Sequence, residues 1–117
     1  MAHLSAHPLV VEARRVGAGV VVHLAGAAEM AAAEGLRDRL EQLADQADRP
    51  IVLDLTDLEF LGSAALGALL SALARAGHDV GAIRLVHPQP FVMRVLETTR
   101  LTRLFPVYPT VDDALAD

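Results

Sequence analysis

The sequence predicts an α/β fold: one domain with a mixed sheet of four to five strands and about four helices. Two observations support this class. Apolar runs rich in Val, Ile and Leu alternate with segments whose leucines recur at helical spacing, as in strands joined by crossover helices. The length of 117 residues suits one domain with a single hydrophobic core. The predicted order is β-β-α-β-α-β-α-(β)-α, with right-handed crossovers.

Local patterns predict the first three elements. Residues 9–16 and 20–25 are β-branched runs, and Gly17-Ala18-Gly19 between them has the composition of a hairpin turn. Residues 31–47 are expected to form an amphipathic helix that stops before Pro50, with Arg37 and Glu41 spaced to pair on its outer face. The apolar stripe of this helix is Leu36, Leu40, Leu43 and Ala47.

The second half of the chain continues the alternation. Residues 51–55 are a short apolar strand, Ser63 begins a helix that ends near Gly77, and residues 83–86 are a fourth strand. Pro90 opens a third helix, and a short edge strand follows at residues 107–108. A capping box at Thr110-Val111-Asp112-Asp113 begins a small last helix. In the helix that begins at Ser63, Leu66, Leu69, Leu70 and Leu73 are expected to point one way. The helix that begins at Pro90 carries Phe91, Val92, Val95 and Leu96.

Composition excludes several classes of enzyme. The sequence contains no Cys and no Lys, which removes disulfides, thiolate nucleophiles, Schiff-base lysines and phosphate-loop lysines. Ten basic against fifteen acidic residues give a net charge of −5 and a pI of about 5.4, which argues against nucleic acid binding. We expect no metal and no cofactor, because His3 and His7 are spaced as a ligand pair but have no evident third ligand.

Residues 1–8 are expected to form a flexible arm and residues 9–117 the domain. The arm lacks the basic region and apolar run of a signal peptide. No apolar run approaches the ~20 residues that span a bilayer. The expected location is therefore the cytoplasm.

The predicted topology gathers polar loops at one edge of the sheet. In open α/β sheets, sites form where the carboxyl ends of the strands meet, which here selects residues 26–29, 56–63 and 87–89. Ser63 is the most informative of these residues because it stands at the start of a helix. One interpretation makes Ser63 the N-cap, worth about 1 kcal/mol. The other makes it a phosphorylation site, because the helix dipole accommodates the added charge.

The helix after Ser63 carries a face of small side chains. Ala64, Gly67, Ala68, Ser71 and Arg75 follow at helical spacing, opposite much of the leucine stripe. Small side chains let another backbone approach closely. The face is either a docking surface or the ordinary filling of an Ala-rich helix, and its position beside Ser63 favours docking.

Enzymatic interpretations of the polar residues are weaker. A nucleophile elbow needs Gly two residues on either side of the Ser, and Leu61 and Ala65 stand there. His23 is expected to be a half-buried sheet residue. Asp54 and Asp57 could be paired carboxylates, although a strand-end acid and a turn acid are the commoner interpretation. We therefore expect no catalytic site.

Four segments resemble the STAS domain, and specifically the stand-alone anti-sigma factor antagonists of bacterial partner switches. The resemblance extends over roughly residues 9–117. Its segments are Gly26-Ala27-Ala28-Glu29, Ile51-Val52-Leu53-Asp54-Leu55, Leu58-Glu59-Phe60-Leu61-Gly62-Ser63-Ala64-Ala65-Leu66-Gly67-Ala68-Leu69, and Val95-Leu96 leading to Leu101-Thr102-Arg103-Leu104-Phe105-Pro106-Val107.

The resemblance implies a function in transcriptional regulation. In that family the antagonist binds an anti-sigma factor that is also a serine kinase and so frees the sigma factor. Phosphorylation of one serine at the start of the second helix ends the interaction, and a phosphatase restores it. The corresponding serine here would be Ser63. The expected partner-binding residues are Glu29, Gly62, Ser63, Ala64, Gly67, Ala68 and Ser71.

The chain departs from the family pattern around the serine. The family usually places Asp before the serine and Gly-Leu after it, whereas Gly62 precedes Ser63 and Ala64-Ala65-Leu66 follow. Glu29 replaces the Asp of the family's first loop, and Arg100 stands where Gly is usual. These differences favour an alternative function, a STAS-like structural subunit of a transport or signalling complex without phosphorylation. The sequence leaves the oligomeric state open, including a homodimer.

Overall fold

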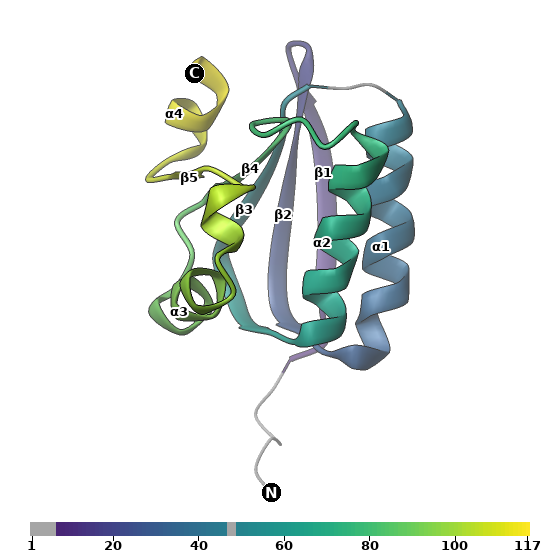
Figure 1. Ribbon diagram of the computed structural model, residues 1–117, viewed down its shortest axis with the longest axis vertical. Helices are drawn as coiled ribbons and strands as arrows, with labels where there is room; N and C mark the ends of the chain where they lie inside the picture. Colours follow the sequence, from purple (N-terminus) through teal and green to yellow (C-terminus); the bar gives the residue numbers. More distant parts are fainter. Residues whose placement is uncertain (1–6, 47–48) are drawn as a thin grey trace, which may run out of the picture.

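The computed structural model describes residues 7–46 and 49–117, which form a five-stranded sheet covered by helices (Figure 1). The strands are β1 (Val10–Val16), β2 (Gly19–Ala28), β3 (Ile51–Leu61), β4 (Ile83–Val86) and β5 (Val107–Tyr108). The helices are α1 (Met30–Asp45), α2 (Ser63–Arg75), α3 (Pro90–Thr98), the 3-10 turn η2 (Leu101–Arg103) and α4 (Val111–Ala116). Residues 1–6 of the expected arm and Ala47 of the expected stripe lie outside the described residues.

The sheet is mixed, as predicted. Its strand order is β1-β2-β3-β4-β5. β1 runs antiparallel to β2 through the turn at residues 17–18, and β2, β3, β4 and β5 are parallel to one another. The hairpin, the alternation of strands and helices, and the short edge strand at residues 107–108 are therefore confirmed.

β2 and β3 extend further than predicted. The sequence pattern ended them at residues 25 and 55, but they continue to Ala28 and Leu61. Their pairing shifts register between His23 and Ala25 and again between Gly26 and Ala27. Such bulges place two residues of one strand opposite one of the other and interrupt the alternation of apolar and polar residues. This break in alternation made residues 26–28 and 56–61 look like loops in the sequence, although they continue the two strands.

The two faces of the sheet are covered differently. α1 and α2 lie side by side over one face (Figure 1), above a core that includes the fully buried Leu24, Leu40 and Leu53. On the other face a second cluster consists of Val21, Val52 and Val86 under Ala114 of α4. A helix on this face covers apolar residues that would otherwise meet water, at roughly 25 cal/mol per Å² of apolar surface.

Local signals at several helix ends are confirmed. Pro90 begins α3, and Gly77 follows α2 with a φ of +78°, a conformation that glycine adopts easily. The Thr110 side chain accepts a hydrogen bond from the Asp113 N–H at 3.1 Å, and Asp113 and a neighbouring acid lie in the first turn of α4. The turn η2, which was not predicted, follows Arg100, whose φ is +62°.

Three side chains lie differently from the predicted pattern. Leu70 is 41% exposed although Leu69 and Leu73 are buried, and Phe91 is 49% exposed although Val92 and Leu96 of its helix are buried. Arg37 contacts Asp38 at 3.8 Å rather than Glu41. Glu41 instead turns toward α2, as the next section describes.

Candidate functional site

The starts of α1 and α2 lie next to each other at the carboxyl ends of β2 and β3. The Gly62 N–H donates a hydrogen bond to the Ala28 carbonyl at 3.0 Å, and Ala28 pairs with Leu61 in the sheet. Glu29, the exposed N-cap of α1, directly follows Ala28, and Ser63, the first residue of α2, directly follows Gly62. The structure thus brings Glu29 and Ser63 to one edge.

Ser63 is the first helical residue of α2 rather than its N-cap. The N-cap is Gly62, in extended backbone conformation and without a side-chain cap, so the interpretation of Ser63 as N-cap is wrong. Ser63 is exposed, and within the described residues its hydroxyl has no hydrogen-bond partner. The helix begins at Ser63 itself, one residue earlier than the N-cap interpretation requires, so the Ser63 hydroxyl does not cap the helix.

The backbone beside Ser63 favours a negative group. The first helical hydrogen bond runs from the Leu66 N–H to the Gly62 carbonyl at 3.0 Å, so the N–H groups of Ser63, Ala64 and Ala65 precede it. The first turn of α2 contains no acidic residue. These N–H groups and the positive end of the helix dipole are therefore available to an anion at Ser63.

The small-residue face of α2 is divided between the α1 interface and the surface. Ala64 and Gly67 are exposed, but Ala68 is only 2% exposed, so its side chain offers almost no area to a partner. Met30 and Arg37 of α1 border the groove left between the two helices. The residues that line this groove are Met30, Ala33, Glu34, Arg37, Ala64, Gly67, Ala68 and Ser71.

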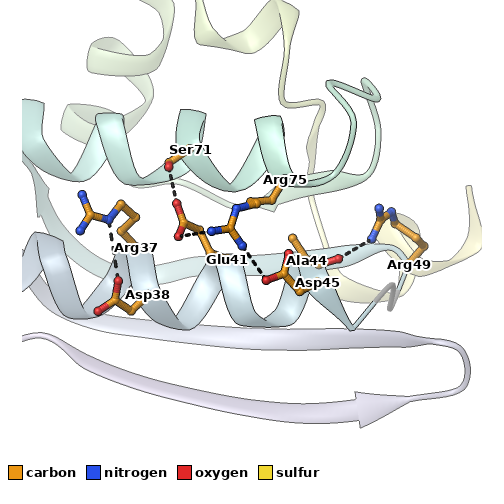
Figure 2. Close-up of polar contacts among 8 residues, drawn as sticks. All are labelled: Arg37, Asp38, Glu41, Ala44, Asp45, Arg49, Ser71 and Arg75. Carbon is orange, nitrogen blue, oxygen red and sulfur yellow. Dashed lines mark hydrogen bonds and ion pairs between the residues drawn. The ribbon is translucent and has the colours of Figure 1, made fainter.

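Polar contacts hold the far end of the same helix pair together (Figure 2). The half-buried Ser71 donates its hydroxyl hydrogen to Glu41, whose side chain is 18% exposed. Arg75 contacts Glu41 at 3.5 Å and Asp45 at 2.6 Å. The hydrogen bond with Asp45, together with the charges of Asp45 and Glu41, raises the pKa of Arg75. Ser71, predicted as a docking residue, thus has a structural partner in α1.

An aromatic pair that the sequence did not predict lies beside Ser63. Phe60 of β3 and Phe91 of α3 stack with ring centroids 5.8 Å apart, and they are 39% and 49% exposed. A Cβ at Gly62 would lie 3.2 Å from the Phe60 ring, so the ring covers this position closely. Met30, on the α1 side of the edge, is 81% exposed. The available signal was the rarity of Phe, since the chain has 3, two of which lie exposed at this edge.

Polar pairs lie on the face of the sheet that α1 and α2 do not cover, near the carboxyl end of β3. His23 contacts Asp57 at 2.7 Å and His7 contacts Glu59 at 2.9 Å. Asp54 accepts hydrogen bonds from the N–H and hydroxyl of Thr56. Asp54 and Asp57 therefore have separate partners, and Asp57 belongs to β3 rather than to a turn. His23 is half-buried in the sheet, as predicted.

Residues 7–46 and 49–117 contain neither a cluster of metal-binding side chains nor a membrane-spanning helix. No three His, Asp or Glu side chains converge closely enough to hold a metal ion. None of the helices in this part of the chain combines the length and the apolar character needed to cross a membrane.

Several known proteins are similar to this chain. "Putative anti-anti-sigma factor Rv2638" of Mycobacterium tuberculosis is 42% identical over 66 residues, which are 56% of this chain and 45% of the relative. The match thus spans less than half of that relative's length. "Putative anti-sigma factor antagonist BtrV" of Bordetella bronchiseptica is 30% identical over 97 residues, which are 83% of this chain and 84% of the relative.

Solved structures share the same architecture. An anti-sigma factor antagonist from Mycobacterium paratuberculosis superposes with a TM-score of 0.83 at 29% identity and covers 93% of this chain and 92% of its own. The Bacillus cell fate determinant SpoIIAA in its phosphorylated form has a TM-score of 0.68 at 21% identity, with 93% and 97% covered. The second likeness concerns the fold alone.

A match to a protein-family model agrees with the fold and with the similar proteins. The model of the STAS domain matches residues 7–114, which is nearly the whole chain. This chain therefore belongs to the STAS domain family.

Proposed function

We propose that this chain is an anti-sigma factor antagonist that binds an anti-sigma factor through the surface at the start of α2. Phosphorylation of Ser63 by a kinase activity of that partner ends the complex, and a phosphatase restores it. The names of the relatives from Mycobacterium tuberculosis and Bordetella bronchiseptica support the regulatory class. The observation that carries the proposal is the exposed Ser63 at the N-terminus of α2, whose first turn has no acidic residue and whose N-cap makes no side-chain hydrogen bond.

The geometry around Ser63 gives a physical reason for gating at this position. A phosphate adds about −1.5 to −2 charges at neutral pH. The N–H groups at the start of α2 accommodate that charge, so the fold tolerates it. A partner docked over Ser63 and the neighbouring Ala64 would meet a new, strongly hydrated charge. Each ~1.4 kcal/mol lost in the complex weakens binding tenfold.

The docking surface combines the predicted residues with those found in the structure. Glu29, Gly62, Ser63, Ala64 and Gly67 lie at the edge or along the groove, and the exposed apolar side chains of Met30, Phe60 and Phe91 flank them. Exposed apolar side chains grouped around a polar centre are typical of protein interaction sites. Ala68 and Ser71 contribute indirectly, because they set the distance between α1 and α2.

The test captures the chain from an extract of its source cells, with and without ATP. We expect an anti-sigma factor to be retained without ATP, and ATP to reduce retention while phosphate appears on Ser63 in the mass spectrum. The variant Ser63→Ala should keep the partner in both conditions. Thr98→Ala is the control, because it removes an exposed hydroxyl at the end of α3 that the docking surface does not include, and it should behave like the unchanged chain. Retention that is insensitive to ATP, with Ser63 unmodified, contradicts the gating.

The structural-subunit function is supported by one observation. The residues on both sides of Ser63 differ from the family pattern, since Gly62 replaces the usual acid and Ala64-Ala65 follow. A constitutive subunit should elute with its complex from a size-exclusion column whether or not ATP is present. An antagonist should leave its partner when ATP is added.

A further inference from the structure

The strand β1 forms one edge of the sheet, and within residues 7–46 and 49–117 no strand pairs with its outer side. It spans seven residues and pairs with β2 in unbroken register, from Val10 with Ala25 to Val16 with Gly19. The strand contains no proline and no bulge in this register, the features that commonly protect an edge. The opposite edge, β5, has only two residues.

The hairpin geometry determines which main-chain groups of β1 face outward. A two-residue turn makes the flanking pair, Val16 with Gly19, a hydrogen-bonded pair. Hydrogen-bonded and non-hydrogen-bonded pairs then alternate along an antiparallel ladder. Val10, Glu12, Arg14 and Val16 therefore bond to β2. The N–H and C=O groups of Val11, Ala13 and Arg15 point to the open edge.

Two charged side chains of β1, Glu12 and Arg14, lie on one exposed face of the sheet. Glu12 lies opposite His23 and Arg14 opposite Val21, so both project from the face of the sheet that α4 covers only in part. Both are exposed, and neither has an ion-pair partner within the described residues. On the other face Val11 and Ala13 are half-buried, so the helix layer covers them incompletely.

We propose that β1 pairs antiparallel with β1 of a second copy of this chain, about a two-fold axis at Ala13. The outward main-chain groups then meet, with Ala13 opposite its own copy and Val11 opposite Arg15 on both sides of the axis. On the α4 face Glu12 lies opposite Arg14 of the second copy, and the symmetry repeats this ion pair. Val10 lies opposite Val16. A two-fold interface requires such a self-complementary pattern.

The charges select this register over its neighbours. A two-fold axis at Glu12 would place Glu12 opposite its own copy, and an axis at Arg14 would do the same for Arg14. Like charges directly opposite each other are destabilising, whereas opposite charges stabilise a cross-strand pair. The register centred on Ala13 alone among these three places acid opposite base. The charges on this edge therefore favour pairing with a second copy instead of preventing it.

This inference does not rest on the function proposed for Ser63, because it uses a different element of the fold. It is tested by analytical ultracentrifugation of the full chain at concentrations up to about 1 mM, in low and high salt. We expect a dimer whose dissociation constant rises with salt, because exposed ion pairs are screened. A chain that remains monomeric at every concentration overturns the proposal.

Charge exchange is the decisive measurement. Glu12→Arg and Arg14→Glu each create like-charge pairs twice in the dimer, and each should raise the dissociation constant at least about tenfold. The double variant with both substitutions restores opposite charges and should return the constant to within about threefold of the original. Glu97→Arg, an exposed change of equal charge on α3, should leave it unchanged. A dimer that survives both single exchanges is held elsewhere and overturns the proposal.

A main-chain variant adds an independent test. Ala13→Pro removes an N–H that points to the open edge and leaves the bonds to β2, and edge strands tolerate proline in such places. The variant should therefore fold and be monomeric. Thermal unfolding identifies a variant that fails to fold, in which case the charge-exchange result alone decides the proposal.

Discussion

Replacement of Ser63 by Glu tests whether the start of α2 accommodates negative charge. The hydroxyl has no partner to lose within the described residues, and the first turn of α2 has no acidic residue. A carboxylate in the first turn of a helix stabilises by about 0.3–1 kcal/mol at low ionic strength. In a domain of this size that gain corresponds to a rise in Tm of roughly 1–5 °C.

The assay is thermal unfolding of the unchanged chain, Ser63→Glu and Ser63→Gln in low salt and in about 1 M salt. The Gln variant matches the shape without the charge, so the difference between the two variants isolates the charge effect. That difference should shrink in high salt, because the Debye length falls to about 3 Å. A lower Tm for Ser63→Glu than for Ser63→Gln in low salt would refute the reasoning, since phosphate at Ser63 would then strain the fold.

Other contacts give further predictions. Glu41→Ala removes the contacts of the Glu41 side chain with Ser71 and Arg75 of α2 and should lower the free energy of unfolding by about 1–2 kcal/mol. Asp38→Ala, which removes an exposed ion pair of the same helix, should change it by less than about 0.5 kcal/mol. Denaturant titration measures both, and equal losses would contradict the assignment. Thr110→Ala removes the cap of α4 and should cost about 1 kcal/mol in the same titration, while an unchanged midpoint would contradict the role of the cap. The hydrogen bond to Asp117, and secondarily burial, raise the pKa of Tyr108, the single tyrosine, so its absorbance should titrate at a higher pH in the unchanged chain than in Asp117→Asn. The stability from this raised pKa is complete below pH 10 and is lost as the pH rises through the folded pKa. A stability that rises over that range would contradict the assignment.

Elements defined by neighbouring residues could be predicted from the sequence. The hairpin turn, the start of α3 at Pro90 and the cap of α4 at Thr110 depend on residues within a few positions of one another. Their signals are turn composition, a fixed φ and a side chain that reaches the adjacent backbone. These signals operate before any tertiary contact forms, which is why the structure agrees with them.

The ends of β2 and β3 could not be predicted because they depend on pairing. The register shifts after His23 and after Gly26 exist only when two distant strands meet. In the sequence, the resulting break in alternation around Thr56 and Glu59 looks like a loop. Only the ladder between the strands supplies the hydrogen bonds that keep this segment extended.

The candidate site was predicted only in part, for the same reason. Ser63 could be identified because a hydroxyl at the start of a helix is a local signal. The stacking of Phe60 on Phe91 and the contact between Ser71 and Glu41 join residues about thirty positions apart. The sequence places the small side chains of α2 on one face of the helix. In the fold, some of them are exposed on the surface, and others contact the neighbouring helix.

The strand order also has a consequence for how the chain folds during synthesis. Because the strands lie in the sheet in the same order as in the sequence, each new strand can add to the strand made just before it. Domains fold while synthesis proceeds from the N-terminus. The second cluster of the core is completed last, when Arg84 binds the main-chain oxygens of Ala114 and Asp117 and α4 settles on the sheet. A nascent chain that has not yet formed α4 would leave Val21 and Val52 without the cover that Ala114 gives them in the folded domain.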